Sequence, residues 1–319
     1  PTIAFLGPDT FIPICRALWP GLIDAAVKHD INLLYVAGEG LGDPDNFRVQ
    51  ANVLYELVTT ERIDGVGIWT STLDRFIHAD KLKAFLARYA DVPMISLGEI
   101  VKGMPSLIMD SYRGMYDAVT HLIDVHGYRR LAFLRGPEGH YYAQERYRAY
   151  TDALSAFGLP IDPTLILPPQ DWEVQTGEAT VRILLDERRL RPKTDVEALV
   201  AANDNIALGT LEALQSRGIR VPDDIAVTGF NDKLESRFST PPLTTVTAPF
   251  YELGEQVIEM LTALIRGEQV PEQVVVPSRL VARQSCGCVS PVVAQAAAGL
   301  VAEMEEPLPQ VLTRRRAAI

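Results

Sequence analysis

The stretch of sequence that decides the fold is ALVAANDNIALGTLEALQSRGIRVPDDIAVTGFND, residues 198–232. Its first apolar run stops at Asn203, a helical pattern follows, and a second apolar run ends shortly before Asn231. This alternation is typical of a βαβ unit in a parallel sheet. In open α/β sheets, ligands bind beyond the carboxyl ends of the strands. We therefore expect the two carboxamides to lie side by side, if their strands are neighbours, and to hydrogen-bond a polar ligand.

Asn203 also has a second interpretation, as the residue that caps the following helix. Capping alone explains one such motif well. It explains less well why polar residues end two strands at matching positions, so both interpretations stay open at this point.

The same alternation runs through most of the chain. Several of the helical patterns between the apolar runs end in glycine, as at Gly127, Gly158 and Gly218, which suits a left-handed helix end. We predict an α/β fold with two Rossmann-like lobes, whose parallel sheets are joined by a hinge of several crossing segments. The expected strands are residues 3–6, 31–36, 65–69, 94–97, 107–109, 131–134, 165–167, 199–201 and 225–227, and 273–284 is expected to add a β pair.

The lobe boundaries are expected where the pattern pauses. The alternation restarts after Asp110, and Pro241 and Pro242 interrupt it a second time. The prediction is an N-terminal lobe of residues 1–109 plus 243–268, and a C-terminal lobe of 110–242 plus 269–288. Residues 289–319 form a C-terminal extension, in which apolar side chains recur every four residues as in an amphipathic helix.

Charge and composition exclude several classes of protein. The net charge of -11 argues against nucleic-acid binding by this chain, and the basic cluster at Arg314, Arg315 and Arg316 is more typical of a solvated tail. No apolar run reaches the roughly 18 residues of a membrane span, so we expect no membrane contact. The chain begins with Pro1 rather than Met, which indicates a cut start.

The cysteines predict neither a disulfide framework nor a metal site. Cys15, Cys286 and Cys288 are an odd and sparse set, which fits a reducing cytoplasm. The CGC segment is too short for an ordinary disulfide, and no other cluster of cysteine and histidine completes a zinc site in the sequence. The five histidines are scattered, so we expect free thiols, no metal and no cofactor.

Several longer motifs together resemble the lactose/galactose repressor (LacI/GalR) family, which shares the type I periplasmic sugar-binding fold. They are residues 198–232 followed by TPPLTTV (240–246), DSYRGMYDAVTHLIDVHGYRRLAFLRGP (110–137), ERYRAYTDAL (145–154) and the final RQSCGC (283–288). The resemblance covers roughly residues 2–288 and implies a ligand-binding domain with a cleft between two lobes. Ala149 and Tyr150 replace the Gly and Phe of the family's R-x-x-G-F segment.

The resemblance also implies which residues contact the ligand. Arg146 matches the arginine that binds ligand oxygens with its planar donors, and Asn203 matches the Asn of the family's A-N-D motif. Asn231 stands where the family usually has Asp, which favours a ligand flatter or less rich in hydroxyl groups than a simple monosaccharide. The remaining expected contacts are Trp172, which packs on a sugar face, Asp9, Thr10 and Phe11 in the first loop, and His140, Tyr141 and Tyr142 at the mouth. Asp110 is expected to be a hinge or capping residue.

The function expected from this resemblance is a non-catalytic sensor of a sugar, nucleoside or similar polar ligand. The family's helix-turn-helix is not found in the sequence, and the C-terminal extension suggests a relay to an output domain such as a kinase or cyclase. One alternative is the effector-binding core of a DNA-binding regulator, which contacts DNA only through a domain not in this chain. A transport protein and, remotely, an α/β enzyme are the others. A cytoplasmic homodimer is expected from the family.

Overall fold

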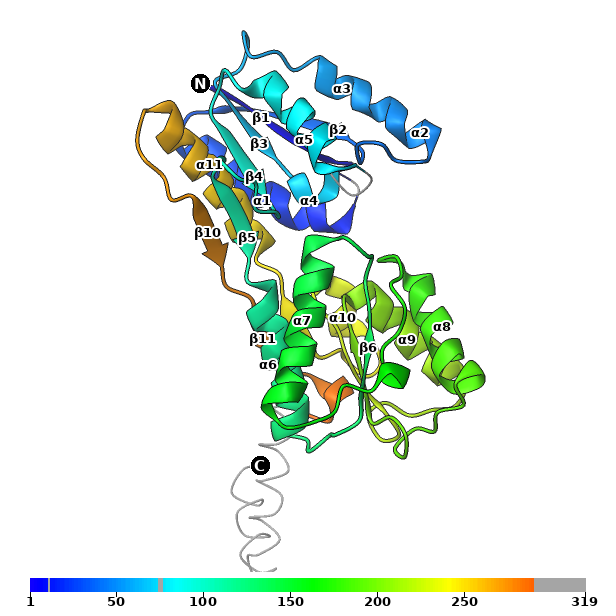
Figure 1. Ribbon diagram of the computed structural model, residues 1–319. Helices are drawn as coiled ribbons and strands as arrows, with labels where there is room; N and C mark the ends of the chain where they lie inside the picture. The colour runs from blue at the N-terminus through cyan, green and yellow to red at the C-terminus, as the bar shows by residue number, and fades with distance from the viewer. Residues whose placement is uncertain (11, 74–76, 290–319) are drawn as a thin grey trace, which may run out of the picture.

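The computed structural model describes residues 1–10, 12–73 and 77–289. Figure 1 shows two lobes stacked end to end, with the N-terminal lobe in blue to cyan and the C-terminal lobe mostly in green. No described helix is both long and apolar enough to cross a bilayer. The predicted extension at 290–319, including its relay to an output domain, lies outside the described residues.

The N-terminal lobe is built on a six-stranded sheet in the order β10-β5-β4-β3-β1-β2, in which every pairing is parallel. Its elements are β1 (Thr2–Pro8), α1 (Pro13–Lys28), β2 (Asn32–Gly38), α2 (Asn46–Val49), α3 (Val53–Glu56), β3 (Gly65–Ile68), α4 (Thr70–Leu73), α5 (Ala79–Leu86), β4 (Met94–Leu97), β5 (Ser106–Met109), α11 (Phe250–Ile265) and β10 (Gln273–Val276).

Alternation along β1 shows how this sheet is covered on both faces. Ile3 and Phe5 belong to the core that includes residues of α1 and α11. Ala4 and Leu6 belong to a second core, which includes Tyr55 of α3 and aromatic residues of the α5 region. Because successive side chains of a strand point to opposite faces, an unbroken apolar run such as 3–6 requires helices on both sides.

The C-terminal lobe has a shorter parallel sheet, β6-β7-β8, beside an antiparallel pair formed by β11 and β9. Its elements are α6 (Ser111–Asp124), β6 (Leu131–Leu134), α7 (Tyr141–Ala156), α8 (Val174–Arg182), β7 (Ala198–Ala201), α9 (Asp204–Ser216), β8 (Ala226–Thr228), α10 (Leu234–Phe238), β9 (Thr245–Thr247), β11 (Arg279–Val281) and the short 3₁₀ helix η5 (Gln284–Cys286).

Two expected strands differ from the structure. Residues 165–167 do not form a strand, since Pro163–Leu165 is a 3₁₀ turn that the side chain of Asp162 caps, and only Ile166 bridges to Phe133. The β pair expected near residue 275 is two strands in different sheets, with β10 beside β5 and β11 beside β9.

The position of β10 corrects the expected assignment of residues 269–288 to the C-terminal lobe. The chain returns to the N-terminal sheet for β10, where it adds a parallel edge strand, before it crosses once more. We propose lobes of residues 1–109 plus 248–276, and 110–247 plus 277–288. The hinge then has three crossing segments, and two of them are tied together where the Asp110 N–H donates to the Val276 carbonyl at 2.8 Å.

Candidate ligand-binding site

A cavity of about 280 Å³ lies between the lobes, and both lobes supply its walls. The C-terminal ends of the parallel strands of each lobe face this space, as expected for open α/β sheets. Its volume is close to the lower end of the range of about 300–1,000 Å³ that ligand pockets occupy. The C-terminal lobe contributes His140, Tyr142, Arg146, Trp172, Glu173, Asn203, Asn205, Asn231 and Lys233, and the N-terminal lobe contributes Glu39, Asp43, Arg48, Trp69, Ser71, Thr72 and Phe250 among others.

Arg146 is the buried cation of this cavity. It lies on α7 with 3% of its surface exposed, and its guanidinium carbon is 3.7 Å from the centre of the Phe230 ring. Nε donates to Ser111 Oγ at 2.8 Å and Nη1 donates to the Ala202 carbonyl at 2.6 Å. Nη2 reaches Asn231 Oδ1 at 3.4 Å. Burial lowers the pKa of Arg146 to about 9, so the group remains a cation at neutral pH.

Trp172 forms an aromatic wall beside this cation. Its ring centre is 5.7 Å from the guanidinium carbon of Arg146 and 5.1 Å from the ring of His140, which meets it edge-on. A Cβ at Gly136 would lie 2.4 Å from the indole, so the indole occupies space that only a glycine leaves open. The Trp172 carbonyl accepts from Asn203 Nδ2 at 3.1 Å and from Asn205 Nδ2 at 2.9 Å.

Asn203 caps the following helix and also lies at the cavity, and its contact with a ligand stays a prediction. Its Oδ1 caps α9 by accepting from the Ile206 N–H at 2.9 Å, and the residue also lines the cavity. Asn231 follows β8, which is the neighbour of β7, so the two carboxamides do share one edge of the sheet. Asn231 has a φ of 117°, in the left-handed region that Asn tolerates better than most residues.

Tyr142 connects the cavity wall to the hinge. Its hydroxyl accepts from the main-chain N–H of Met109, the last residue of β5, at 3.1 Å. Burial raises the pKa of Tyr142, so the phenol stays protonated at neutral pH. The side chain is therefore fixed next to the first crossing segment and beside the Arg146 guanidinium, which is 5.9 Å from its ring centre.

The N-terminal lobe supplies a polar wall that was not predicted from the sequence. Glu39, Asp43 and Arg48 follow β2, and Ser71 and Thr72 follow β3. Burial raises the pKa of Glu39, and the charge of Arg48 opposes this rise. The rule that identified Asn203, polar residues just after a buried parallel strand, would have found these residues if it had been applied to the first lobe.

Three expected contacts are not among the described residues that line the cavity. Asp9, Thr10 and Tyr141 are described but do not line it. Tyr141 instead packs edge-on against Tyr142, with ring centres 5.4 Å apart. Phe11 lies outside the described residues. Asp110 has the expected capping role, because its Oδ1 accepts from the Arg113 N–H at 2.9 Å.

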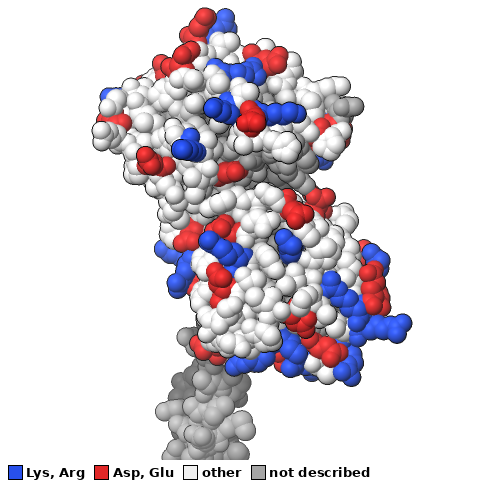
Figure 2. Space-filling model, in the orientation of Figure 1, with Lys and Arg blue, Asp and Glu red and all other residues white. Residues whose placement is uncertain are grey.

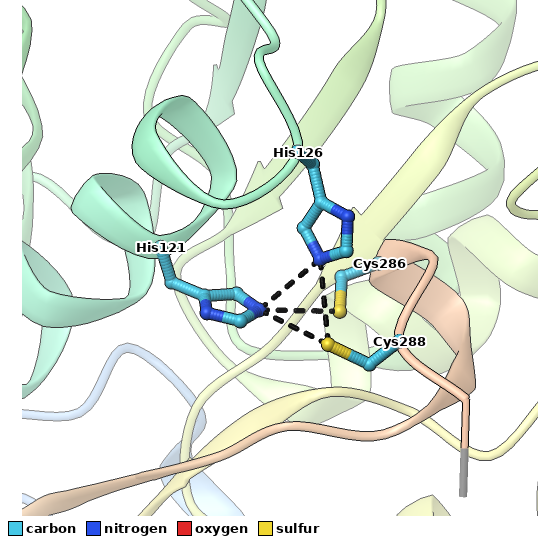
Figure 3. Close-up of side chains that lie close together, drawn as sticks. All are labelled: His121, His126, Cys286 and Cys288. Atoms are coloured by element: carbon cyan, nitrogen blue, oxygen red, sulfur yellow. Dashed lines mark hydrogen bonds between the residues drawn. The ribbon is translucent and has the colours of Figure 1, made fainter. Parts of the chain in front are cut away.

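The thiols are free, as expected, but the expectation that the histidines are scattered and form no cluster with the cysteines is wrong. The structure brings His121, His126, Cys286 and Cys288 together, with one ligand atom from each inside a cluster no more than 4.8 Å across (Figure 3). Sequence analysis missed this because the two pairs are far apart in the chain. The available signal was an H-x₄-H segment combined with a C-x-C segment, which are both spacings of metal ligands.

Comparison with known proteins places the chain in a family. The model of the periplasmic binding protein-like domain family matches residues 119–286. The chain is 27% identical over 284 residues to the HTH-type transcriptional regulator DegA of Bacillus subtilis (strain 168), covering 89% of this chain and 80% of the relative. It is 31% identical over 231 residues to the HTH-type transcriptional regulator CelR of Thermobifida fusca, covering 70% of this chain and 64% of the relative.

A solved structure shows the same fold. The complex of the transcriptional regulator CelR with cellobiose matches with a TM-score of 0.74 and 27% identity, over 89% of this chain and 84% of that chain. This agreement covers both lobes rather than one βα unit. The chain belongs to the family of periplasmic binding protein-like domains, in the form that LacI/GalR-type transcription regulators carry.

Proposed function

We propose that this chain is the effector-binding core of a DNA-binding transcription regulator, and that its effector is a small carbohydrate bound between the lobes. The observation that carries this proposal is the buried guanidinium of Arg146 at the wall of an interlobe cavity. Its planar donors suit the paired oxygens of a sugar, and the aromatic ring of Trp172 beside it suits a sugar face.

The alternatives from the sequence receive less support. The relatives are named as transcriptional regulators of the HTH type, which favours a DNA-binding output over a kinase, a cyclase or a transport role. On the face drawn in Figure 2, basic and acidic side chains are intermingled over both lobes. We therefore propose that DNA contact is made through a segment outside this chain. We also propose, from the family resemblance, that the regulator is a cytoplasmic homodimer and that the cavity binds its ligand without catalysis.

The cavity lining supports a neutral ligand. Its basic Arg and Lys side chains equal its acidic Asp and Glu side chains in number, so together they do not select a strongly charged molecule. They are Arg48, Arg146 and Lys233 against Glu39, Asp43 and Glu173. Lys233 Nζ is already engaged by Asn205 Oδ1 at 2.7 Å. Carboxamides and aromatic rings make up much of the remaining C-terminal wall. The solved CelR relative binds cellobiose, which supports a carbohydrate over a nucleoside.

The first test is a thermal-shift panel of monosaccharides, disaccharides, sugar alcohols and nucleosides, followed by calorimetric titration of each ligand that raises the melting temperature. Arg146→Gln removes the cation from the wall. Loss of a hydrogen bond from a charged donor costs about 1.5–3 kcal/mol, and each 1.4 kcal/mol is about tenfold in affinity. We expect the dissociation constant to rise by about 10- to 100-fold.

Arg148→Gln is the matched control, because Arg148 lies on the same helix but is exposed and pairs with Glu145. Circular dichroism shows whether each variant folds, and Trp172→Leu gives a second disruption of the wall. A sugar that binds equally well to wild type and to both cavity variants contradicts the assignment of the site. Binding by nucleosides alone contradicts the carbohydrate class but keeps the cavity.

A further inference from the structure

The cluster of His121, His126, Cys286 and Cys288 lies apart from the ligand cavity. His121 is in the last turn of α6, and His126 is just beyond the end of that helix. Cys286 ends η5, and Cys288 follows after Gly287. None of the four lines the cavity, and in Figure 1 η5 lies at the end of the C-terminal lobe that faces away from the N-terminal lobe.

The distances within the cluster are those of ligands around one ion. His121 Nε2 lies 3.2 Å from His126 Nε2 and 3.4 Å from Cys288 Sγ. Cys288 Sγ lies 3.4 Å from His126 Nε2, and Cys286 Sγ lies 3.6 Å from His121 Nε2. All four atoms point into a common centre (Figure 3) and lie within 4.8 Å of one another.

A tetrahedral zinc site gives a numerical standard for these distances. Zinc binds histidine nitrogen at about 2.0–2.1 Å and cysteine sulfur at about 2.3 Å. Tetrahedral angles then place two nitrogens about 3.3 Å apart, and a nitrogen and a sulfur about 3.6 Å apart. The four distances given above agree with these values to a few tenths of an ångström.

We propose that these four side chains form a structural Cys₂His₂ site for a single zinc ion. Two imidazoles and two thiols form one of the ligand sets that structural zinc takes. With four protein ligands the ion has no open position for a substrate, so the site stabilises the fold and does not act on a ligand. The short nitrogen-to-nitrogen distance favours one ion over a cluster with separate metal centres for each ligand pair.

The protonation states of the ligands are compatible with this site. Burial lowers the pKa of His121, with a smaller contribution from His126, and burial also lowers the pKa of His126. Both rings are therefore neutral at pH 7 and have a lone pair to donate. Burial raises the pKa of Cys288 to about 11. Because zinc must displace that proton, metal binding is expected to weaken as the pH falls.

The surroundings of the cluster resemble the second shell of a metal site. Thr244 Oγ1 lies 3.0 Å from Cys286 Sγ and can donate to a thiolate there. The hydroxyl of Tyr128 donates to the Cys286 carbonyl at 3.1 Å, and its ring stacks on that of His126. Such outer contacts orient ligands and tune their affinity.

Gly287 makes the turn between the two cysteines possible. Its φ is 108°, in the left-handed region where only glycine is free of strain. A Cβ at this position would also lie 3.2 Å from His126 Nδ1. The C-G-C turn can therefore bring both sulfurs to the same side of the chain, close against the imidazole.

The site would connect the end of α6 to the last described segment of the chain. Cys286 and His121 are separated by 165 positions, and Cys288 and His121 by 167. A metal ion that links such distant positions closes a long loop, which restricts the unfolded chain and holds the end of the domain in place. Zinc would thus fix the last described segment of the chain to the end of α6.

The test is metal analysis of the full chain, purified under reducing conditions from zinc-supplemented cells. We expect one zinc ion per chain by plasma mass spectrometry, and a lower melting temperature after a zinc chelator removes it. Replacement of zinc by Co²⁺ should give visible ligand-field bands of tetrahedral intensity and a thiolate charge-transfer band. Cys288→Ser and His126→Gln should each lose the stoichiometric metal and the cobalt spectrum.

Matched controls keep the same chemistry outside the cluster. Cys15→Ser changes a cysteine in the N-terminal lobe, and His78→Gln changes an exposed histidine. Both controls should retain one zinc per chain. The proposal is overturned if wild-type protein binds no zinc after reconstitution under reductant, or if Cys288→Ser and His126→Gln, folded by circular dichroism, bind as much zinc as the controls do.

Discussion

Asp204 is a buried carboxylate that holds three elements together at the single-residue scale. It is fully buried and accepts from Thr245 Oγ1 at 2.6 Å, Ser236 Oγ at 2.7 Å and the Lys233 N–H at 2.8 Å. Burial raises the pKa of Asp204, and these donors oppose the rise. The residue thus fixes the start of α9 to α10 and β9.

Asp204→Ala should destabilise the protein, because it leaves three donors without their acceptor. A buried group left unsatisfied costs about 1–3 kcal/mol. Since the two hydroxyls can rotate toward other acceptors, we expect a loss of about 3 kcal/mol in the free energy of unfolding rather than the full sum. Urea denaturation followed by circular dichroism measures this loss. Asp223→Ala, at an exposed position, is the control and should change stability by less than about 0.5 kcal/mol; equal losses in the two variants would contradict the argument.

The sequence predicted residues best where polar side chains directly follow a buried strand of a parallel sheet. Asn203 and Asn231 were expected at one sheet edge, and the structure places them there. Arg146 was expected at the cavity, but its contacts with Phe230 and Ala202 join segments that lie far apart in the chain. Asp9 and Thr10 were placed by analogy alone, and they are not among the residues that line the cavity, although Pro8 and Ile12 are.

At the scale of elements, two glycines allow α1 and α11 to pack with their backbones in contact. A Cβ at Gly21 would lie 2.0 Å from the Tyr251 carbonyl oxygen. A Cβ at Gly254 would lie 2.5 Å from the Leu18 carbonyl oxygen. Neither carbonyl oxygen can move away easily, because both belong to the main chain of a helix.

Gly254→Ala tests this helix contact, because two opposing effects can be compared. In an open helix, alanine is more favourable than glycine by about 1 kcal/mol. Overpacking a close contact typically costs about 1–3 kcal/mol and occasionally more, and a clash with backbone belongs at the upper end. We expect a net loss of about 2 kcal/mol in urea denaturation. Gln256→Ala, on the exposed side of the same helix, should be nearly neutral; stabilisation by Gly254→Ala would show that the helices separate freely.

The pattern of elements was predictable because most strands of the two parallel sheets are buried on both faces and therefore read as apolar runs. Residues 94–97 and 131–134 match β4 and β6 residue for residue. The strand order was not predictable at β10, because its pairing with β5 joins positions separated by well over a hundred residues. The cluster of His121, His126, Cys286 and Cys288 could not be predicted from the sequence for the same reason, because α6 and η5 meet only in the folded chain.

At the scale of the whole molecule, we expect the cavity to couple ligand binding to the arrangement of the lobes. Its walls come from both lobes, and the lobes are joined by three crossing segments. A ligand shifts a conformational equilibrium only through its different affinity for the two states. A ligand that contacts both walls gains its full set of contacts only when the lobes are close, and it therefore favours closure.

The expected result is a smaller radius of gyration in small-angle X-ray scattering when the sugar is saturating. The double variant Asp43→Ala/Arg48→Ala weakens the N-terminal wall and leaves Arg146 and the C-terminal wall intact. It should bind more weakly by calorimetry and, when saturated, should show a smaller decrease in radius. Arg113→Ala, at an exposed position outside the cavity lining, serves as the control and should become as compact as wild type. If the wild-type radius does not change at saturation, the ligand does not drive closure, and the signal to an attached DNA-binding segment must travel through side-chain changes within one lobe.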